Sequence, residues 1–151
     1  MKLMLNGAVT LGTYDGANIE IVEQAGFENN YVFGARVEDI ATLKKSYDPK
    51  KIYSRNKNIR RVVDTLVSGL CDDGGDGSFR SLYESLIKGS DTECADAYYL
   101  LQDLEPYVET KLLVNKDYKN TTLFRRKCFE NIINSGFFSS DRTVSEYVWD
   151  L

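Results

Sequence analysis

The stretch AVTLGTYDGANIEIVEQAG, residues 8–26, decides the fold class of this chain. Its first five residues, Ala8–Gly12, form a short apolar run ending in glycine, which predicts a buried strand. Asp15 follows in a predicted turn and is placed to cap the next element. The apolar spacing from Ala17 to Ala25 then predicts a helix that ends at Gly26. This strand–turn–helix pattern indicates an α/β fold.

The same alternation continues for one more round. Tyr31–Gly34 predicts a second short buried strand, and Val37, Ile40 and Ala41 begin a second helical pattern. Strands that alternate with helices at this spacing are typical of a parallel sheet covered by helices. The sequence therefore predicts two neighbouring parallel strands within the first 45 residues.

After residue 45 the sequence predicts helices only. Residues 59–70 have apolar side chains at the spacing of one long amphipathic helix. Other helices are predicted over residues 78–87, with Phe79, Leu82, Leu86 and Ile87 inward; from Asp103, with Pro106 in the first turn; along Phe124, Cys128 and Ile132; and from Asp141 or Thr143 through Tyr147, Val148 and Trp149. Two strands are fewer than a doubly wound sheet needs, so we expect the C-terminal part of a larger α/β domain.

Composition excludes several kinds of chemistry. The chain has 151 residues and no histidine, which excludes Ser-His-Asp and Cys-His triads and Cys₂His₂ zinc sites. Cys71, Cys94 and Cys128 are odd in number and far apart, so we expect small buried apolar groups in a reducing compartment, and no metal site. No apolar run is long enough to span a membrane, and the N-terminus does not predict a signal peptide.

One segment is strongly basic although the chain has a net charge of -4. Residues 44–61 hold Lys44, Lys45, Lys50, Lys51, Arg55, Lys57, Arg60 and Arg61 with one acid, Asp48, and with Tyr47 and Tyr53 interleaved. This pattern is compatible with a footprint for a phosphate backbone or an anionic polysaccharide, or with a solvated helical surface. The acidic remainder of the chain would repel a duplex, which favours the solvated surface.

An acidic, glycine-rich stretch, residues 71–79, begins like a calcium-binding loop. Counted from Asp72, the third position is Gly74 and the twelfth is Tyr83, where such a loop needs an oxygen ligand and a bidentate glutamate. We therefore interpret it as a surface loop.

Lys2 is distinguished only by its neighbours, which are apolar on both sides. We expect a lysine in an apolar turn before a buried strand to be desolvated. Burial lowers the pKa of an amine and frees its lone pair, the state that a lysine needs to attach a carbonyl cofactor.

The block Met1-Lys2-Leu3-Met4-Leu5-Asn6-Gly7-Ala8 closely resembles the segment that holds the pyridoxal phosphate lysine in the α-glucan phosphorylases. The resemblance continues through residues 10–20 and 33–39 and returns at Ser139-Ser140-Asp141-Arg142-Thr143, so it covers the chain nearly end to end. Residues 70–100 match weakly.

This resemblance implies the C-terminal part of a Rossmann-like, GT-B type glycosyltransferase domain, with few parallel strands and then a mostly helical tail. Residues 1–45 would be the end of the βαβα cofactor segment, and residues 46–151 the helical C-terminal portion of the same domain. The implied cofactor is pyridoxal 5′-phosphate on Lys2, with no other catalytic residue in this chain. Asp15, Gly16 and Asn18 are assigned turn and helix-start roles.

The implied reaction is reversible phosphorolysis of an α-1,4-glucan to glucose 1-phosphate. The implied partners are glycogen or maltodextrin, inorganic phosphate, the remainder of a phosphorylase chain and a second subunit in a homodimer, in the cytoplasm. No nucleic-acid or membrane partner is expected, and the isolated chain is expected to be inactive. The alternatives are a structural or interaction module derived from that domain and, as a third reading, a nucleic-acid binder that uses the basic segment.

Overall fold

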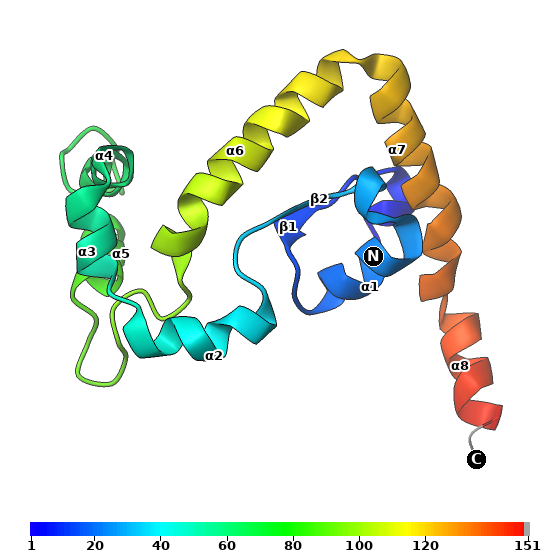
Figure 1. Ribbon diagram of the computed structural model, residues 1–151, viewed down its shortest axis with the longest axis horizontal. Helices are drawn as coiled ribbons and strands as arrows, with labels where there is room; N and C mark the ends of the chain where they lie inside the picture. Colours follow the sequence, from blue (N-terminus) through cyan, green and yellow to red (C-terminus); the bar gives the residue numbers. More distant parts are fainter. Residues whose placement is uncertain (150–151) are drawn as a thin grey trace. The chain divides into compact units, whose positions relative to one another are not determined.

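The computed structural model describes residues 1–149, which fall into two compact units (Figure 1). Unit 1 comprises Met1–Val37 with Val108–Leu151, and unit 2 comprises Glu38–Tyr107. Unit 1 contains η1 (Met4–Asn6), β1 (Leu11–Thr13), α1 (Ala17–Ala25), η2 (Phe27–Asn29), β2 (Tyr31–Phe33), α7 (Thr121–Asn134), η3 (Ser135–Phe138) and α8 (Ser140–Trp149). Unit 2 contains most of α2 (Val37–Ser46), and α3 (Pro49–Arg55), α4 (Lys57–Thr65) and α5 (Ser78–Ile87); α6 (Leu100–Lys119) has residues in both units.

The predicted parallel strand pair is confirmed. Leu11 pairs with Tyr31 and Thr13 pairs with Phe33, with α1 in the crossover between the strands. β1 begins three residues later than the predicted start at Ala8. The reason is that the Ala8 amide donates to the Leu3 carbonyl and closes the turn around η1, so residue 8 is not free to join the sheet.

The apolar core of unit 1 is small. Met4, Ile21 and Ala25 form a buried cluster against which Phe138 packs, and Val22 is completely buried. Figure 1 shows α7 running beside α1 and η2, two elements that it contacts. Helix α1 begins and ends where the apolar spacing predicts.

Polar bonds from α7 tie this unit together. The fully buried Asn131 donates from Nδ2 to the backbone carbonyls of Asn29 (2.9 Å) and Lys127 (3.0 Å). The Lys127 amine donates to the Glu28 carbonyl and lies 5.0 Å from the centre of the Tyr31 ring. The Tyr31 hydroxyl in turn donates to Asp117 at 2.8 Å. Three residues of α6 and α7 thus hold the segment 28–31.

Unit 2 has an apolar core of a different kind. Its buried cluster is Ile59, Val63, Leu86, Ile87 and Leu101. The core is therefore built from α4, α5 and the first turn of α6.

Helix α3 starts with Pro49 after Asp48, whose carboxylate accepts hydrogen bonds from the Lys50 and Lys51 amides.

Two predicted apolar faces are shorter than expected. The helix predicted over residues 59–70 ends at Thr65, and Leu70 is 77% exposed, because residues 66–70 turn away and Ser68 bonds back to the Thr65 carbonyl. Leu82, predicted to face inward, is 44% exposed. It lines a cleft of about 460 Å³ formed with the segment 89–98, while Leu86 and Ile87 are buried in the core and Tyr83 packs against it.

Two predicted caps are also wrong. Asp15 does not cap α1; its carboxylate accepts from the Thr13 hydroxyl instead. Asp103 does not start α6, because the helix already begins at Leu100 and contains Pro106 in its interior. The capping carboxylate belongs to Asp96, which accepts from the Leu100 and Leu101 amides at 2.8 Å each.

The expectation that all three cysteines are buried is wrong as well. Cys71 and Cys94 are exposed and Cys128 is half-buried. The first two lie in segments between helices, where no apolar face covers them. Among residues 1–149, no helix has the length and apolar character needed to cross a bilayer.

Candidate functional site

The loop after β1 lies within the block at residues 10–20, one of the stretches that carry the resemblance. At Gly12 in β1, a Cβ atom would lie 2.6 Å from Nδ2 of Asn18, so a larger residue there would displace the Asn18 side chain. That Nδ2 donates to the Thr13 carbonyl at 3.0 Å and so fixes the start of α1 against the end of β1. The side chain of Asn18 therefore acts on the backbone of the loop.

Aromatic and cationic contacts link the ends of the two strands. The Tyr14 ring lies 5.2 Å from the Phe27 ring, and the Arg36 guanidinium lies 4.9 Å from the Tyr14 centroid. Tyr14 follows β1 and Arg36 follows β2, so the contact between them joins the two carboxyl ends, while Phe27 connects Tyr14 to η2 before β2. Ligands bind at such strand ends in parallel α/β sheets. Here, however, the amides of Asn18 and Ile19 already donate to the Asp15 and Gly16 carbonyls, so these two amides are not available to bind a ligand.

The assignment of Asp15, Gly16 and Asn18 to turn and helix-start roles agrees with this geometry, apart from the missing cap by Asp15. Asp15 and Gly16 are exposed, and the interactions that the structure gives to Asp15 and Asn18 lie within residues 13–18. The loop is therefore a rigid connection between β1 and α1.

Lys2 lies in the turn that precedes η1, and its side chain is exposed. The expected desolvation is wrong, because the residue that enters the core is Met4, which is only 2% exposed. The backbone around Lys2 is nevertheless fixed. Asn6 Nδ2 donates to the Lys2 carbonyl at 3.2 Å, and the Gly7 amide donates to the Met4 carbonyl at 2.9 Å. Within residues 1–149 the structure gives the Lys2 amine no hydrogen bond or ion pair, so it is accessible to a ligand.

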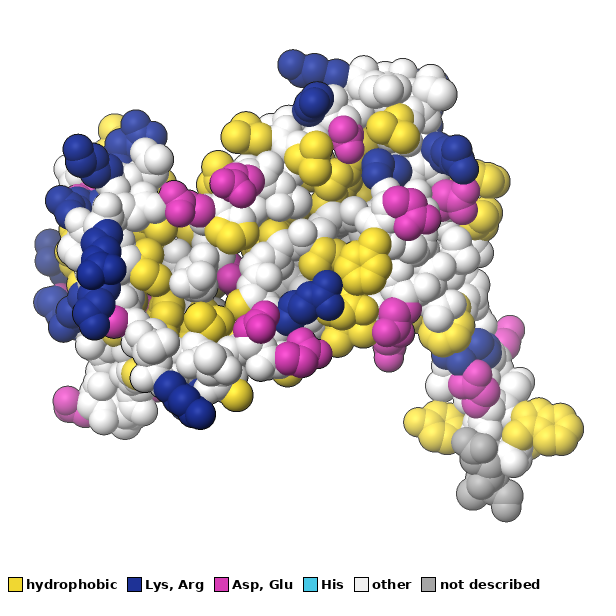
Figure 2. All heavy atoms as spheres, viewed as in Figure 1, with side chains coloured by type: hydrophobic (Ala, Val, Ile, Leu, Met, Phe, Trp, Pro, Cys, Tyr) yellow, Lys and Arg dark blue, Asp and Glu magenta, His cyan; other side chains and the backbone are white. Residues whose placement is uncertain are grey.

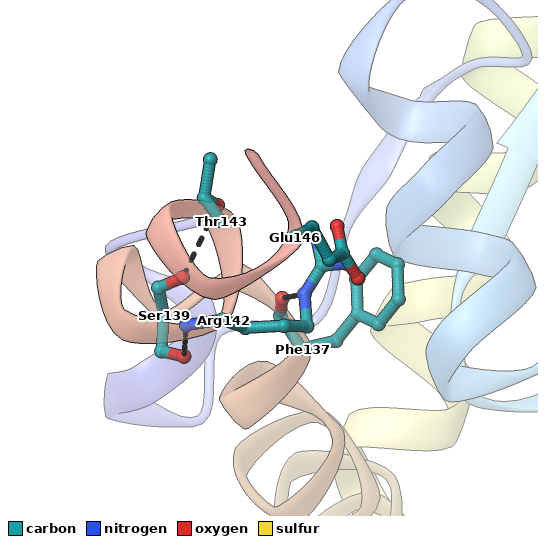
Figure 3. Close-up of polar contacts among 5 residues, drawn as sticks. All are labelled: Phe137, Ser139, Arg142, Thr143 and Glu146. Carbon is teal, nitrogen blue, oxygen red and sulfur yellow. Dashed lines mark hydrogen bonds and ion pairs between the residues drawn. The ribbon is translucent and has the colours of Figure 1, made fainter. Parts of the chain in front are cut away.

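The block Ser139–Thr143 forms the start of α8, as shown in Figure 3. The Ser139 hydroxyl accepts from the Arg142 amide, and the Thr143 hydroxyl donates to the Ser139 carbonyl, both at 3.3 Å. The Arg142 guanidinium lies 3.8 Å from the centre of the Phe137 ring, donates to the Phe137 carbonyl and pairs with Glu146. This block therefore sets the angle between η3 and α8.

Sequence reasoning missed a buried tyrosine–aspartate pair in unit 2. Asp96 is 3% exposed and accepts from the Tyr47 hydroxyl as well as from the start of α6. Burial, together with the hydrogen bond and charge of Asp96, raises the pKa of Tyr47 above its ordinary value of 10.0. Asp96 precedes an apolar run and is a favoured capping residue type, but Pro106 favoured Asp103 for that role.

The acidic loop around residues 71–79 uses its carboxylates for its own turns. Asp72 and Asp73 accept from the Gly74 and Gly75 amides, and Asp76 accepts from the Ser78 amide at 2.8 Å. Hydrogen bonds from the Ser78 amide and hydroxyl lower the pKa of Asp76. Within residues 1–149 no group of three or more potential metal ligands is brought together.

Comparison with known proteins identifies the family. The family model for carbohydrate phosphorylases matches residues 1–151. The brain form of glycogen phosphorylase from Mus musculus is 38% identical over 152 residues, and the glycogen phosphorylases of Bacillus subtilis and Synechocystis are 35% and 39% identical. Each of these alignments covers 100% of this chain but only 17–18% of the relative. The match runs through the Lys2 segment, the loop after β1 and the start of α8, and this chain therefore belongs to the carbohydrate phosphorylase family.

Proposed function

We propose that this chain is the cofactor-lysine segment of an α-glucan phosphorylase, an enzyme that uses inorganic phosphate to release glucose 1-phosphate from glycogen or maltodextrin. The observation that carries the proposal is the family match over the whole chain, which includes the block around Lys2. In this proposal Lys2 attaches pyridoxal 5′-phosphate. The fold would be the end of a GT-B type domain, divided into residues 1–45 and 46–151 as the resemblance implies.

The residues present fit the attachment of that cofactor. Attachment needs a primary amine that a carbonyl compound can reach and a backbone that holds the amine in place. The exposed side chain of Lys2 meets the first need. Met4, buried against Ile21 and Ala25, and the bond from Asn6 to the Lys2 carbonyl meet the second.

In the family, the bound cofactor supplies a phosphate that exchanges a proton with the substrate phosphate. This chain's own contribution would be position. Met4 anchors η1 in the core, and the Gly7 amide closes the turn on the Met4 carbonyl. The absence of histidine from the chain is compatible with this arrangement, because the cofactor phosphate would exchange the proton and the chain's own residues need not supply a general acid.

The proposal has consequences for the isolated chain. Because it spans 17–18% of the length of its relatives, most of a phosphorylase lies outside it. We expect it to be inactive alone and to act with the remainder of a phosphorylase chain, in a homodimer and in the cytoplasm. Release of glucose 1-phosphate from maltodextrin and phosphate, above a no-protein control and lost in Lys2→Ala, would contradict this expectation.

Attachment at Lys2 can be tested separately from activity. The chain is incubated with pyridoxal 5′-phosphate over a concentration series, reduced with borohydride and digested, and the labelled lysines are located by mass spectrometry. We expect Lys2 to be labelled ahead of the exposed Lys111 and Lys116, but with low affinity, since the exposed amine indicates a solvated cofactor phosphate. Lys2→Arg should remove that label and leave the others. Equal labelling of all exposed lysines would refute the assignment, and tight stoichiometric binding would refute the low affinity.

A further inference from the structure

The basic segment of unit 2 forms one cationic surface on a pair of adjoining helices. Helix α3 carries Lys50, Lys51 and Arg55, and α4 carries Lys57, Arg60 and Arg61. All six side chains are exposed, and Figure 2 shows the dark blue side chains gathered over these two helices. We call these six residues the cationic face. It lies in unit 2, whereas Lys2 lies in unit 1.

The two helices are held in a fixed arrangement. The Asn56 amide donates to the Ile52 carbonyl and closes α3, while the Asn56 side chain accepts from the Asn58 and Ile59 amides and opens α4. Arg60 donates to the carbonyls of Tyr53 and Ser54. A single residue therefore joins the helices, and one cation of α4 is bonded to the end of α3.

Most of the charge on the cationic face is not neutralised. Across residues 1–149, Lys51 is the only one of the six for which the structure shows an ion pair, with Asp48 at 3.3 Å. Spacing at i and i+4 places Lys51 and Arg55 together on α3, and Lys57 and Arg61 together on α4. Cations this close to one another repel, and binding of an anion would relieve that repulsion.

Features of unit 2 limit which anion fits. The residues of unit 2 outside 44–61 carry twelve acidic and two basic side chains, which would repel an extended duplex or an anionic bilayer. The aromatic rings within the segment are already in use. The Arg60 guanidinium lies 5.6 Å from the centre of the Tyr53 ring, and Tyr47 packs at 4.8 Å on Tyr99. They offer no open platform for stacking bases of a single strand.

We propose that the cationic face is a docking surface for a short acidic segment of a partner protein, a role that goes beyond the proposed function. Helix α4, with nine residues, is about 14 Å long, which matches about four residues of an extended peptide. The guanidinium groups of Arg55 and Arg61 can each hold a carboxylate through two hydrogen bonds. Charge complementarity therefore favours a compact anionic partner that covers the six cations of α3 and α4 and not the whole unit.

The test measures binding of a fluorescein-labelled octaglutamate peptide to the full 151-residue chain by anisotropy in 50 mM NaCl. The informative variant is Arg55→Glu with Arg61→Glu, and we expect it to weaken binding about tenfold or more. The matched control is Arg80→Glu with Arg125→Glu, which changes the net charge equally at two exposed arginines elsewhere and should change affinity by less than about threefold. Circular dichroism of each variant, and the milder pair Arg55→Gln with Arg61→Gln, separate lost binding from lost folding.

The same chain is then titrated with oligo(dT) and with vesicles containing phosphatidylserine, and its self-association is followed by sedimentation. Peptide binding that weakens equally in the control variant would overturn the proposal. So would tighter binding of the oligonucleotide or the vesicles than of the peptide at the same salt. Self-association that is lost only in the Arg55 and Arg61 variant would assign the face to a second copy of the chain and would also overturn it.

Discussion

The two units are stabilised in different ways. Unit 2 has a core of five apolar residues contributed by three helices, all within 43 positions of one another, from Ile59 to Leu101. Unit 1 buries three residues in its largest apolar cluster, and its distant segments are joined by polar bonds such as that from Asn131 to the Asn29 carbonyl, 102 positions apart. Unit 1, which contains the candidate cofactor lysine, therefore depends on a few directional bonds, while unit 2 depends on apolar packing.

The largest expected effect is in the apolar core of unit 2. Ile59→Ala removes a side chain that is 3% exposed and should lower the free energy of unfolding by about 2–5 kcal/mol. Urea denaturation followed by circular dichroism measures the change, and hydrogen exchange should show lost protection in residues 38–107. The control is Val62→Ala, at a side chain 50% exposed, for which a cost near that of Ile59→Ala would contradict the packing account.

The next effect is in the polar connection of unit 1. Asn131→Ala leaves the Asn29 carbonyl without its donor and should cost about 1–3 kcal/mol. Hydrogen exchange should show the loss of protection in residues 27–33 and not in α5. Asn134 serves as the matched control, because its side-chain amide donates to the Glu130 carbonyl of its own helix. If Asn134→Ala opened residues 27–33 to the same extent, the long-range bond would not be the cause.

A smaller effect depends on pH. Burial and Asp96 raise the pKa of Tyr47 above 10.0, so the folded state keeps a proton that the unfolded state releases in alkali. The contribution of Tyr47 to stability is thus fully present below pH 10.0 and is lost as the pH rises toward the folded-state pKa. Tyr47→Phe should cost about 0.5–1.5 kcal/mol at pH 7 and should reduce the fall in stability above pH 10.

Two other tyrosines provide a second test and a control for the measurement on Tyr47. Burial and Asp117 raise the pKa of Tyr31 in unit 1. Tyr31→Phe should therefore reduce the fall in the stability of unit 1 above pH 10 and leave that of unit 2 unchanged. Tyr98, which is 81% exposed, provides the control substitution to phenylalanine. Unfolding is monitored at several pH values between 7 and 11. The prediction is refuted if Tyr47→Phe and Tyr31→Phe lose stability with pH as steeply as the wild type and the Tyr98→Phe control do.

The smallest expected change in stability is at α8. Tyr147, Val148 and Trp149 are 70%, 67% and 88% exposed, and such apolar groups favour association. Tyr147→Ser with Val148→Ser should decrease the binding of an apolar dye and the self-association seen by sedimentation, while the free energy of unfolding changes by less than about 0.5 kcal/mol. A wild-type chain that stays monomeric at high concentration and binds no dye would contradict this prediction.

Sequence patterns predicted the first part of the fold well, because the spacing of apolar residues in 8–41 follows from which side chains of each local element are buried. The sequence of β1, α1, β2 and α2 is found, with α1 bounded by the expected residues. The helix ends at Thr65 and Leu100 were missed, because each depends on a side chain that bonds to the backbone beyond the apolar pattern. The neighbours of Lys2 drew attention to it, and its role as cofactor lysine stays a prediction. Its exposure could not be predicted, since whether Met4 or Lys2 enters the core is settled by Ile21 and Ala25.

The double role of Asn56 has a consequence for changes in chain length. Because the same residue closes α3 and opens α4, an inserted residue beside it would separate the two sets of bonds and alter the angle between the helices. The loop at residues 71–77 is constrained differently, because the bonds from Asp72, Asp73 and Asp76 stay within residues 72–79 and do not set the angle between two helices. Insertions and deletions should therefore be accepted readily in that loop and poorly at Asn56, which makes the loop the natural place to splice in a reporter peptide.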